Sequence, residues 1–298
     1  MGSVGTGTRN NVSGGEEEEE TINVLITGFA PFRTNFPINP SWEIAKSLPE
    51  YLPPPPTPFK GIPGHVPPPS TTTAIPPNPT TTTTTPNPIP LPKVRLLVHP
   101  TPIHVGYRAV RDLVPSLWHL DSPPSPSSPK IDLAIHIGMA GPRGYYAIER
   151  RAHKQPYTMG DVDNNLLSDL DADLARHNIP HPWEDLPEEI LSDLDMEDVL
   201  RRWRDHSPPY SDLRISEDAG HYLCDFIYYS SLAHLMKNQG GEGGGRKKKV
   251  VFLHVPCESG PAWVRVGREV CLGLVRGMVE SEVVREGKLK REEEVGGL

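Results

Sequence analysis

Short apolar runs alternate along this chain with segments in which apolar residues recur at helical spacing. The runs that predict buried strands lie at 22–27, 94–98, 131–137, 145–149, 213–216 and 250–255. The segments that predict helices lie at 42–48, 105–118 and 262–284; acidic helical fragments follow over 166–210, including 185–204, and 152–165 is a predicted loop. Strands that alternate with helices are typical of βαβ units. The pattern therefore predicts an α/β fold.

The chain is organised around the stretch 216–234. Small and polar residues come first, and an apolar run without Pro or Gly then continues until Gly240. This pattern predicts a strand end, a turn at Ala219-Gly220 and a buried helix. Cys224 falls in the first turns of that helix, where the partial positive charge of the N-terminus favours a thiolate, so we expect the pKa of its thiol to be lowered. The alternative for a single cysteine is a small buried hydrophobic residue.

Three segments differ in composition from the predicted core, and the longest of them, which is rich in Pro and Thr, cannot bury enough apolar surface to fold. They are an acidic N-terminal tail at 1–20, which we expect to be disordered, a Pro/Thr-rich insertion at 49–93 and a charged C-terminal tail at 287–298. The insertion is predicted to lengthen a surface loop, which costs little because loop-closure entropy grows slowly with length. The remainder, 21–286 without the insertion, predicts one domain.

The charge and the cysteine content argue against several classes of protein. A formal net charge of -8 gives no electrostatic footprint for binding nucleic acid. No apolar stretch reaches the roughly 18 residues of a membrane span, and the N-terminus lacks the basic and apolar regions of a signal peptide. The three cysteines form no Cys-x-x-Cys pair, which suits a reducing compartment. We therefore expect a cytoplasmic protein without a membrane partner.

Glu149, Cys224 and His254 lie at the ends of predicted core elements and supply the parts of a catalytic triad. A cysteine nucleophile needs a base to take its proton, and the base needs a carboxylate to fix its tautomer. Each residue also has a structural alternative. In that alternative Glu149 forms an ion pair with Arg150 or Arg151, His254 is a core histidine with its hydrogen bonds satisfied, and Cys224 is a small side chain packed in the core.

Four motifs follow one another along the chain. They are Gly28-Phe29-Ala30-Pro31-Phe32 with Asn39-Pro40-Ser41-Trp42, Gly138-Met139-Ala140-Gly141-Pro142-Arg143 with Ile148-Glu149-Arg150, Ala219-Gly220-His221-Tyr222-Leu223-Cys224-Asp225, and Phe252-Leu253-His254-Val255-Pro256. In this order they resemble the signatures of type I pyroglutamyl peptidases. The resemblance covers 22–48, 94–164 and 213–284. It implies a single three-layer α/β/α sandwich with a mixed, mostly parallel central sheet.

The resemblance also implies an activity, that of a cytosolic cysteine exopeptidase without metal or cofactor. Such an omega peptidase removes N-terminal pyroglutamate (5-oxoproline) from peptides through an acyl-enzyme. The matching positions assign Cys224 as the nucleophile, His254 as general base and acid, and Glu149 as the residue that orients the histidine.

A substrate pocket follows from the same resemblance. The pyroglutamyl ring is expected between aromatic side chains, which match Phe29, Phe32 and Tyr222. Asn39 matches a residue that shapes this pocket. Met139 matches a loop position whose backbone carbonyl receives the lactam N–H.

Two departures from the family pattern leave rival interpretations. Arg33-Thr34 stand where the family usually has Gly-Gly, and the loop 157–164 lacks an Arg that in the family is thought to assist the oxyanion hole. The first rival is a catalytically weakened homologue that acts as a binding protein through its Pro/Thr-rich insert. The second is a metal site built from His254, Cys224 and Glu149, which no ligand pair at short spacing supports. The sequence leaves the oligomeric state open, a homo-oligomer included.

Overall fold

The computed structural model describes residues 21–32, 36–55, 91–118, 129–238 and 247–296 of the 298-residue chain. The predicted disordered tail at 1–20 lies outside these residues, and so do most of the predicted insertion and the Arg33-Thr34 departure. All statements below concern the described residues.

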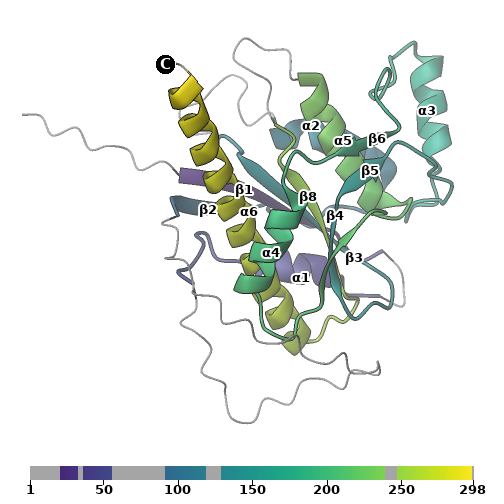
Figure 1. Ribbon diagram of the computed structural model, residues 1–298. Helices are drawn as coiled ribbons and strands as arrows, with labels where there is room; N and C mark the ends of the chain where they lie inside the picture. Colours follow the sequence, from purple (N-terminus) through teal and green to yellow (C-terminus); the bar gives the residue numbers. More distant parts are fainter. Residues whose placement is uncertain (1–20, 33–35, 56–90, 119–128, 239–246, 297–298) are drawn as a thin grey trace, which may run out of the picture.

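A six-stranded sheet forms the centre of the fold (Figure 1). Its strands, in spatial order, are β2 (Lys93–Val98), β1 (Thr21–Gly28), β3 (Leu133–Met139), β8 (Val250–Val255), β4 (Tyr146–Glu149) and β7 (Leu213–Ser216). The first four are parallel, β4 runs antiparallel to β8, and β7 is parallel to β4. This arrangement confirms the predicted mixed, mostly parallel sheet.

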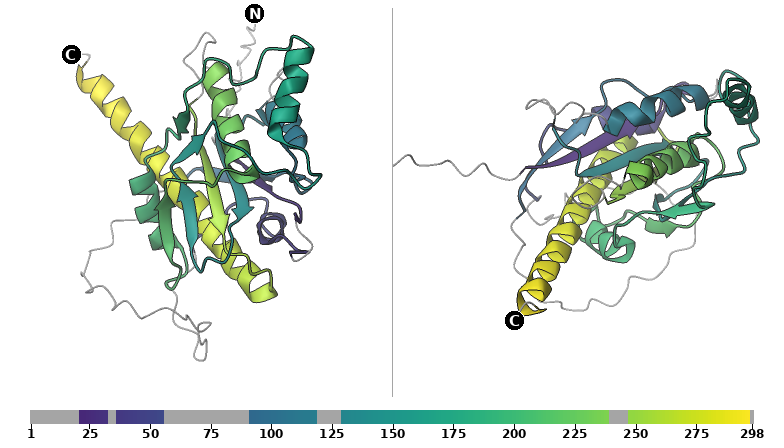
Figure 2. Two further views of the ribbon diagram at one scale, coloured as in Figure 1. Left: turned by 90° about the vertical axis from the view of Figure 1, so that its right-hand side faces the viewer. Right: turned by 90° about the horizontal axis from the view of Figure 1, so that it is seen from above.

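Helices cover both faces of the sheet, so the predicted three-layer α/β/α sandwich is also confirmed (Figure 2). The helices are α1 (Pro40–Lys46), α2 (Tyr107–Trp118), α3 (Leu167–Arg176), α4 (Met196–His206), α5 (Leu223–Lys237) and α6 (Pro261–Gly296). The apolar side chains of α1, α4 and α6 join one core cluster, and those of α2 and α5 join another. A two-stranded ribbon, β5 (Arg151–His153) with β6 (Glu189–Leu191), packs against α5.

The helix predicted after Gly220 is the buried α5, and its burial follows from its sequence. Apolar and aromatic residues occupy nearly every side, and Phe226, Tyr228 and Tyr229 are fully buried. The two tyrosines satisfy their hydroxyls on backbone carbonyls, Tyr228 on Glu149 at 2.9 Å and Tyr229 on Pro187 at 2.6 Å. A helix that is apolar all round needs cover on all sides, and its position between β3, β8 and α2 supplies it.

Two predicted boundaries in the middle of the chain were wrong. The fragment 185–204 is helical only from Met196, because Asp195 caps the helix by accepting from the Asp198 backbone N–H at 3.0 Å. The strand β6 lies before that cap, where a helix was expected. The predicted loop 152–165 begins inside the strand β5.

The ends of the predicted insertion belong to the fold. The Glu50 carbonyl accepts from the Leu96 backbone N–H at 2.7 Å, and the Leu52 N–H donates to the Val94 carbonyl at 3.0 Å. These bonds attach the segment to β2, which itself begins at Lys93. The bounds 49–93 are therefore too wide. At the other end of the chain, α6 continues to Gly296, past the point at 287 where a charged tail was expected.

None of the helices in the described part of the chain is long and apolar enough to cross a membrane.

Candidate active site

The side chains of Glu149 and His254 meet inside the sheet. They come from the neighbouring antiparallel strands β4 and β8, and His254 Nδ1 lies 2.7 Å from Glu149 Oε1. Glu149 is fully buried and His254 is only 5% exposed. A carboxylate oxygen can only accept, so in the neutral imidazole the proton lies on Nδ1 and Nε2 is the acceptor. The imidazole is therefore held in the tautomer that a general base needs.

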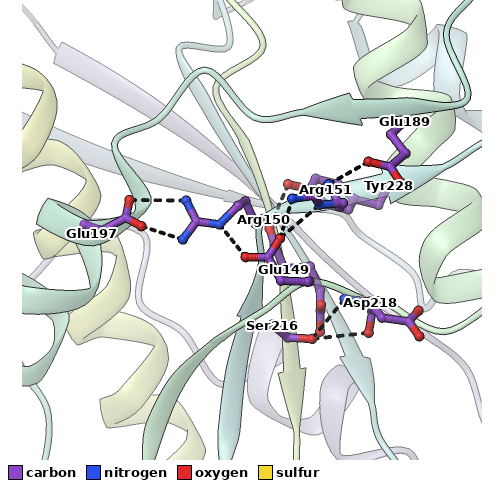
Figure 3. Close-up of polar contacts among 9 residues, drawn as sticks. Glu149, Arg150, Arg151, Glu189, Glu197, Ser216, Asp218 and Tyr228 are labelled. Carbon is purple, nitrogen blue, oxygen red and sulfur yellow. Dashed lines mark hydrogen bonds and ion pairs between the residues drawn. The ribbon is translucent and has the colours of Figure 1, made fainter.

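The structural alternative for Glu149, an ion pair with a neighbouring arginine, does not occur. Arg150 pairs with Glu197 and Arg151 with Glu189 (Figure 3). Glu217 binds both arginines. The second carboxylate oxygen of Glu149, Oε2, is buried and has no hydrogen-bond partner among the described atoms. His254 is thus the partner of the Glu149 side chain, and its pairing leaves one carboxylate oxygen unused.

The sulfur of Cys224 lies against the strand that neighbours His254. Cys224 is the second residue of α5, and the turn before it passes through Gly220, whose φ of 74° is a left-handed conformation that favours glycine. A Cβ at Gly138 would lie 2.9 Å from Cys224 Sγ and 2.5 Å from Phe252 Cζ. Gly138 is the register partner of His254 across β3 and β8. The absence of a side chain at Gly138 therefore opens the space that the sulfur occupies against β3, the strand next to the one that carries His254.

The structure overturns the expected lowering of the Cys224 pKa. The pKa of this thiol is raised to about 12: burial is the largest cause, the carboxylates of Glu149 and Asp225 act in the same direction, and the charge of Arg143 opposes them. Desolvation of the thiolate outweighs the favourable end of the helix in the resting protein. The thiol is therefore protonated at rest, and a neighbouring base has to accept its proton when the sulfur attacks.

Arg143 is a residue to which the sequence assigned no role. It lies in the loop 140–145 after β3, and its positive charge is close enough to Cys224 to lower the pKa of the thiol. The signal for it was present, since Arg143 is the one cationic residue in the motif 138–144. A positive charge here suits the negative charge that develops when a thiolate attacks a carbonyl.

Two of the three predicted aromatic residues lie together. The rings of Phe32 and Tyr222 have centroids 6.5 Å apart, and Phe36 stacks on Phe32 at 6.1 Å. Tyr222 is the N-cap residue of α5, two positions before Cys224. Phe29 is only 3% exposed and belongs to the apolar core. The surface available for a ring beside Cys224 therefore comes mainly from Phe32 and Tyr222.

Asn39 and Met139 lie where the chain leaves the strands β1 and β3. Asn39 is buried, donates to the Ala30 carbonyl at 3.0 Å and accepts from the Ser41 backbone N–H at 3.1 Å, so it fixes the loop after β1. Met139 ends β3 opposite Val255. Both residues border the loops at the ends of β1 and β3, where ligands bind in open α/β sheets.

The loop 157–164, which lacks the expected arginine, is built around a buried aspartate. Asp161 accepts from the backbone N–H groups of Tyr107, Asp163 and Asn165 at 3.1, 3.0 and 2.9 Å. Asn164 has a φ of 63°, which closes the turn. The loop therefore has an internal hydrogen-bond network, and the cation that acts on Cys224 comes from Arg143 instead.

An α/β/α fold with a half-buried cysteine beside its sheet, and with a histidine and a carboxylate on two inner strands, has the parts of a cysteine hydrolase. No protein-family model matches the chain. Over 159 residues the chain is 33% identical to pyroglutamyl-peptidase 1 of Mus musculus and 32% identical to that of Homo sapiens, which covers 53% of this chain and 62% of each relative. The chain thus matches less than two thirds of the length of these relatives.

Solved structures share the fold. The pyrrolidone carboxyl peptidase of Thermococcus litoralis has a TM-score of 0.53 at 18% identity, with 87% of this chain and 94% of that chain covered. The enzyme of Pyrococcus furiosus has a TM-score of 0.51 at 20% identity, with 89% and 99% covered. Together with the curated relatives, these structures confirm the resemblance to the pyroglutamyl peptidase family.

Proposed function

We propose that this chain is a cysteine peptidase that removes N-terminal pyroglutamate from peptides, with Cys224, His254 and Glu149 as its catalytic residues. The observation that carries the proposal is the buried 2.7 Å contact between His254 Nδ1 and Glu149 Oε1, next to the strand position that faces Cys224 Sγ. The printed names of the relatives supply the substrate class.

The reaction follows from this geometry. His254 Nε2 accepts the thiol proton while the sulfur of Cys224 attacks the carbonyl carbon of the pyroglutamyl residue. The peptide C–N bond to the next residue then breaks as the imidazolium returns that proton to the leaving amine. Water next hydrolyses the thioester, with His254 again as base, which releases pyroglutamate and the Cys224 thiol. Glu149 keeps Nδ1 protonated and stabilises the imidazolium, and the guanidinium of Arg143 favours the developing oxyanion.

The proposed substrate site is the space beside Phe32 and Tyr222, with Phe29 and Asn39 behind it and the Met139 carbonyl as acceptor for the lactam N–H. A pyroglutamyl ring is flat and neutral, so apolar faces can cover it while backbone groups satisfy its amide. A free N-terminal ammonium would lose its water on entering the same space, which is costly. The peptide partner of this site is therefore one whose N-terminus is a lactam. A cytosolic location is part of the same proposal and is supported by the free cysteines.

Hydrolysis of a panel of amide reporters tests the proposal. The purified protein should release the reporter from pyroglutamyl amide, and prolyl, glutamyl and glutaminyl amides should react at least about a hundredfold more slowly. Cys224→Ser should lose nearly all activity, because a hydroxyl is a far weaker nucleophile than a thiol at neutral pH. Cys257→Ser is the matched control and should stay within a few fold of the wild type.

Two results would overturn the proposal. One is comparable rates for prolyl and pyroglutamyl reporters, which would refute the lactam pocket. The other is retention of more than about a tenth of the wild-type rate by Cys224→Ser, since loss of a catalytic nucleophile costs orders of magnitude.

A further inference from the structure

Two imidazoles and a carboxylate converge at the start of α5, beside the proposed catalytic residues and separate from them. His153 belongs to β5, His221 to the turn before α5, and Asp225 to the first turn of α5. One possible ligand atom from each of the three residues lies within 4.8 Å of the other two. It is the one such group of three histidine, cysteine or acidic residues found in the described part of the chain.

The carboxylate of Asp225 is oriented toward both rings. Its Oδ1 accepts from the His153 backbone N–H at 2.9 Å, which fixes the plane of the group. Its Oδ2 lies 3.1 Å from His153 Nδ1 and 3.7 Å from His221 Nδ1. A tetrahedral zinc ion with bonds of about 2.0–2.1 Å separates its ligand atoms by roughly 3.3 Å. Small side-chain rotations therefore suffice to bring these atoms onto one ion.

Burial and charge also suit a cation at this position. The Asp225 side chain is fully buried, and both of its ion-pair partners among the described residues are imidazoles. In the form that binds a metal ion, the ligands are one carboxylate and two imidazole nitrogens with free lone pairs, with a net charge of about -1 that a divalent ion compensates. The side chains of His153 and His221 are 16% and 41% exposed, so one side is open to solvent. That side provides an entry path and a position for a water ligand.

We propose that His153, His221 and Asp225 bind a divalent transition-metal ion such as Zn²⁺ or Co²⁺, with a fourth position open to water. Nitrogen and oxygen ligands of this kind favour zinc, cobalt and nickel over magnesium or calcium, which prefer all-oxygen sites. The backbone N–H on Oδ1 acts as the outer hydrogen bond that holds the ligating carboxylate. Such an ion links β5 to the segment that carries Tyr222 and Cys224, and this binding does not depend on peptidase activity.

Cobalt binding measured by absorption and calorimetry tests the site in the full chain. The protein should be Cys224→Ser, so that the thiol cannot serve as a ligand, with Zn²⁺ competing for the same site. The expected result is saturable binding of one Co²⁺ with d–d bands and without a thiolate-to-cobalt charge-transfer band. Zn²⁺ should also raise the melting temperature, because an ion that binds only the folded chain stabilises it.

Three variants distinguish metal binding at this site from binding by histidines elsewhere in the chain. His221→Gln alters an exposed side chain and should weaken binding at least about tenfold, as should Asp225→Asn, which keeps an acceptor for the His153 N–H. His181→Gln is the matched control, because His181 lies 3.2 Å from Asp171 in a pair that lacks a second imidazole. That variant should bind as the parent does.

Several outcomes would overturn the proposal. They are the absence of saturable binding, equal binding by His221→Gln, Asp225→Asn and His181→Gln, and a site that exists in the wild type and disappears with Cys224→Ser. Circular dichroism of each variant confirms that a loss of binding is not a loss of fold.

Discussion

At the scale of single residues, the proposed site depends on one missing side chain and one short hydrogen bond. Gly138 leaves room for Cys224 Sγ, and the carboxylate of Glu149 fixes His254 at 2.7 Å. Both features bring together residues that are far apart in the chain. Each can be removed by changing a few atoms, so each yields a prediction about activity that is separable from folding.

Gly138→Ala would place a methyl group against Cys224 Sγ and the ring of Phe252. One of these groups has to move, so we expect a loss of about 1–3 kcal/mol in the free energy of unfolding, typical of an overpacked core, together with a lower kcat from the displaced sulfur. Urea unfolding and reporter kinetics measure the two effects. Gly141→Ala is the control, since no atom lies within 4 Å of a Cβ there. Equal behaviour of the two variants would contradict the assigned role of Gly138.

Glu149→Gln should keep the fold and lower kcat by at least about a hundredfold, because the amide no longer enforces the tautomer with Nε2 as acceptor. Reporter kinetics and the melting temperature measure the two quantities. Glu189→Gln is the matched control: Glu189 lies on the short neighbouring ribbon, where it pairs with Arg151 on the surface. A Glu149→Gln variant that loses stability and activity together would indicate a structural carboxylate instead.

At the scale of elements, the local sequence pattern was sufficient to predict some strands and helices, whereas others are defined only by their tertiary contacts. The strands β1, β3 and β8 and the helix α5 were predictable, because their apolar runs are long and uninterrupted. The strands β5 and β6 were not, because each has three residues and only one of them is buried. An element that short has no readable period, and only its pairing with a neighbour defines it.

His136 links three elements and makes stability depend on pH. Its Nδ1 lies 2.8 Å from Thr27 Oγ1 on β1, and its Nε2 lies 2.8 Å from Ser231 Oγ on α5. Complete burial lowers the pKa of His136 from 6.5 to about 3. Between these two values the unfolded chain binds a proton that the folded chain does not. The contribution of neutral His136 to the free energy of unfolding is therefore complete above the pKa of the unfolded chain and is lost as the pH falls toward 3.

The expected slope is about 1.4 kcal/mol per pH unit, so lowering the pH from 7 to 5 should remove roughly 2 kcal/mol through this residue. Urea unfolding of the wild type and of His136→Gln at the two pH values measures it. The variant should lose less stability than the wild type over this interval, whatever its stability at pH 7. The same pH dependence in both proteins would show that His136 does not titrate in this way.

At the scale of the whole molecule, one sandwich holds the proposed catalytic residues, and the Pro/Thr-rich segment enters and leaves it at the edge strand β2. The Tyr51 bridge to Arg95 and the backbone bonds of Glu50 and Leu52 tie the entry to that strand. The composition of 56–90 cannot support a packed core. The segment should therefore be separable from the peptidase activity, provided that its attached end is retained.

Replacing 56–90 with a short Gly/Ser linker should leave kcat/KM for the pyroglutamyl reporter within a few fold, because loop entropy changes slowly with length. Replacing 50–92 should also remove the backbone bonds to β2 and lower the melting temperature. Calorimetry and reporter kinetics on the two variants compare the effects. Loss of activity in the shorter replacement would favour the rival in which the insert carries the function.

The sequence by itself determined the α/β class, the central strands, the buried helix α5 and the identity of the residues that carry the proposed chemistry. Apolar periodicity and short motifs are local, so the order of residues is sufficient to read them. The tertiary structure decided the reversed direction of β4, the raised pKa of Cys224, the proximity of Arg143 to that thiol and the convergence of His153 on Asp225, 72 residues away. These depend on burial and on contacts between segments distant in the chain. Desolvation and coordination geometry are properties of that packing, and no local stretch of sequence contains them.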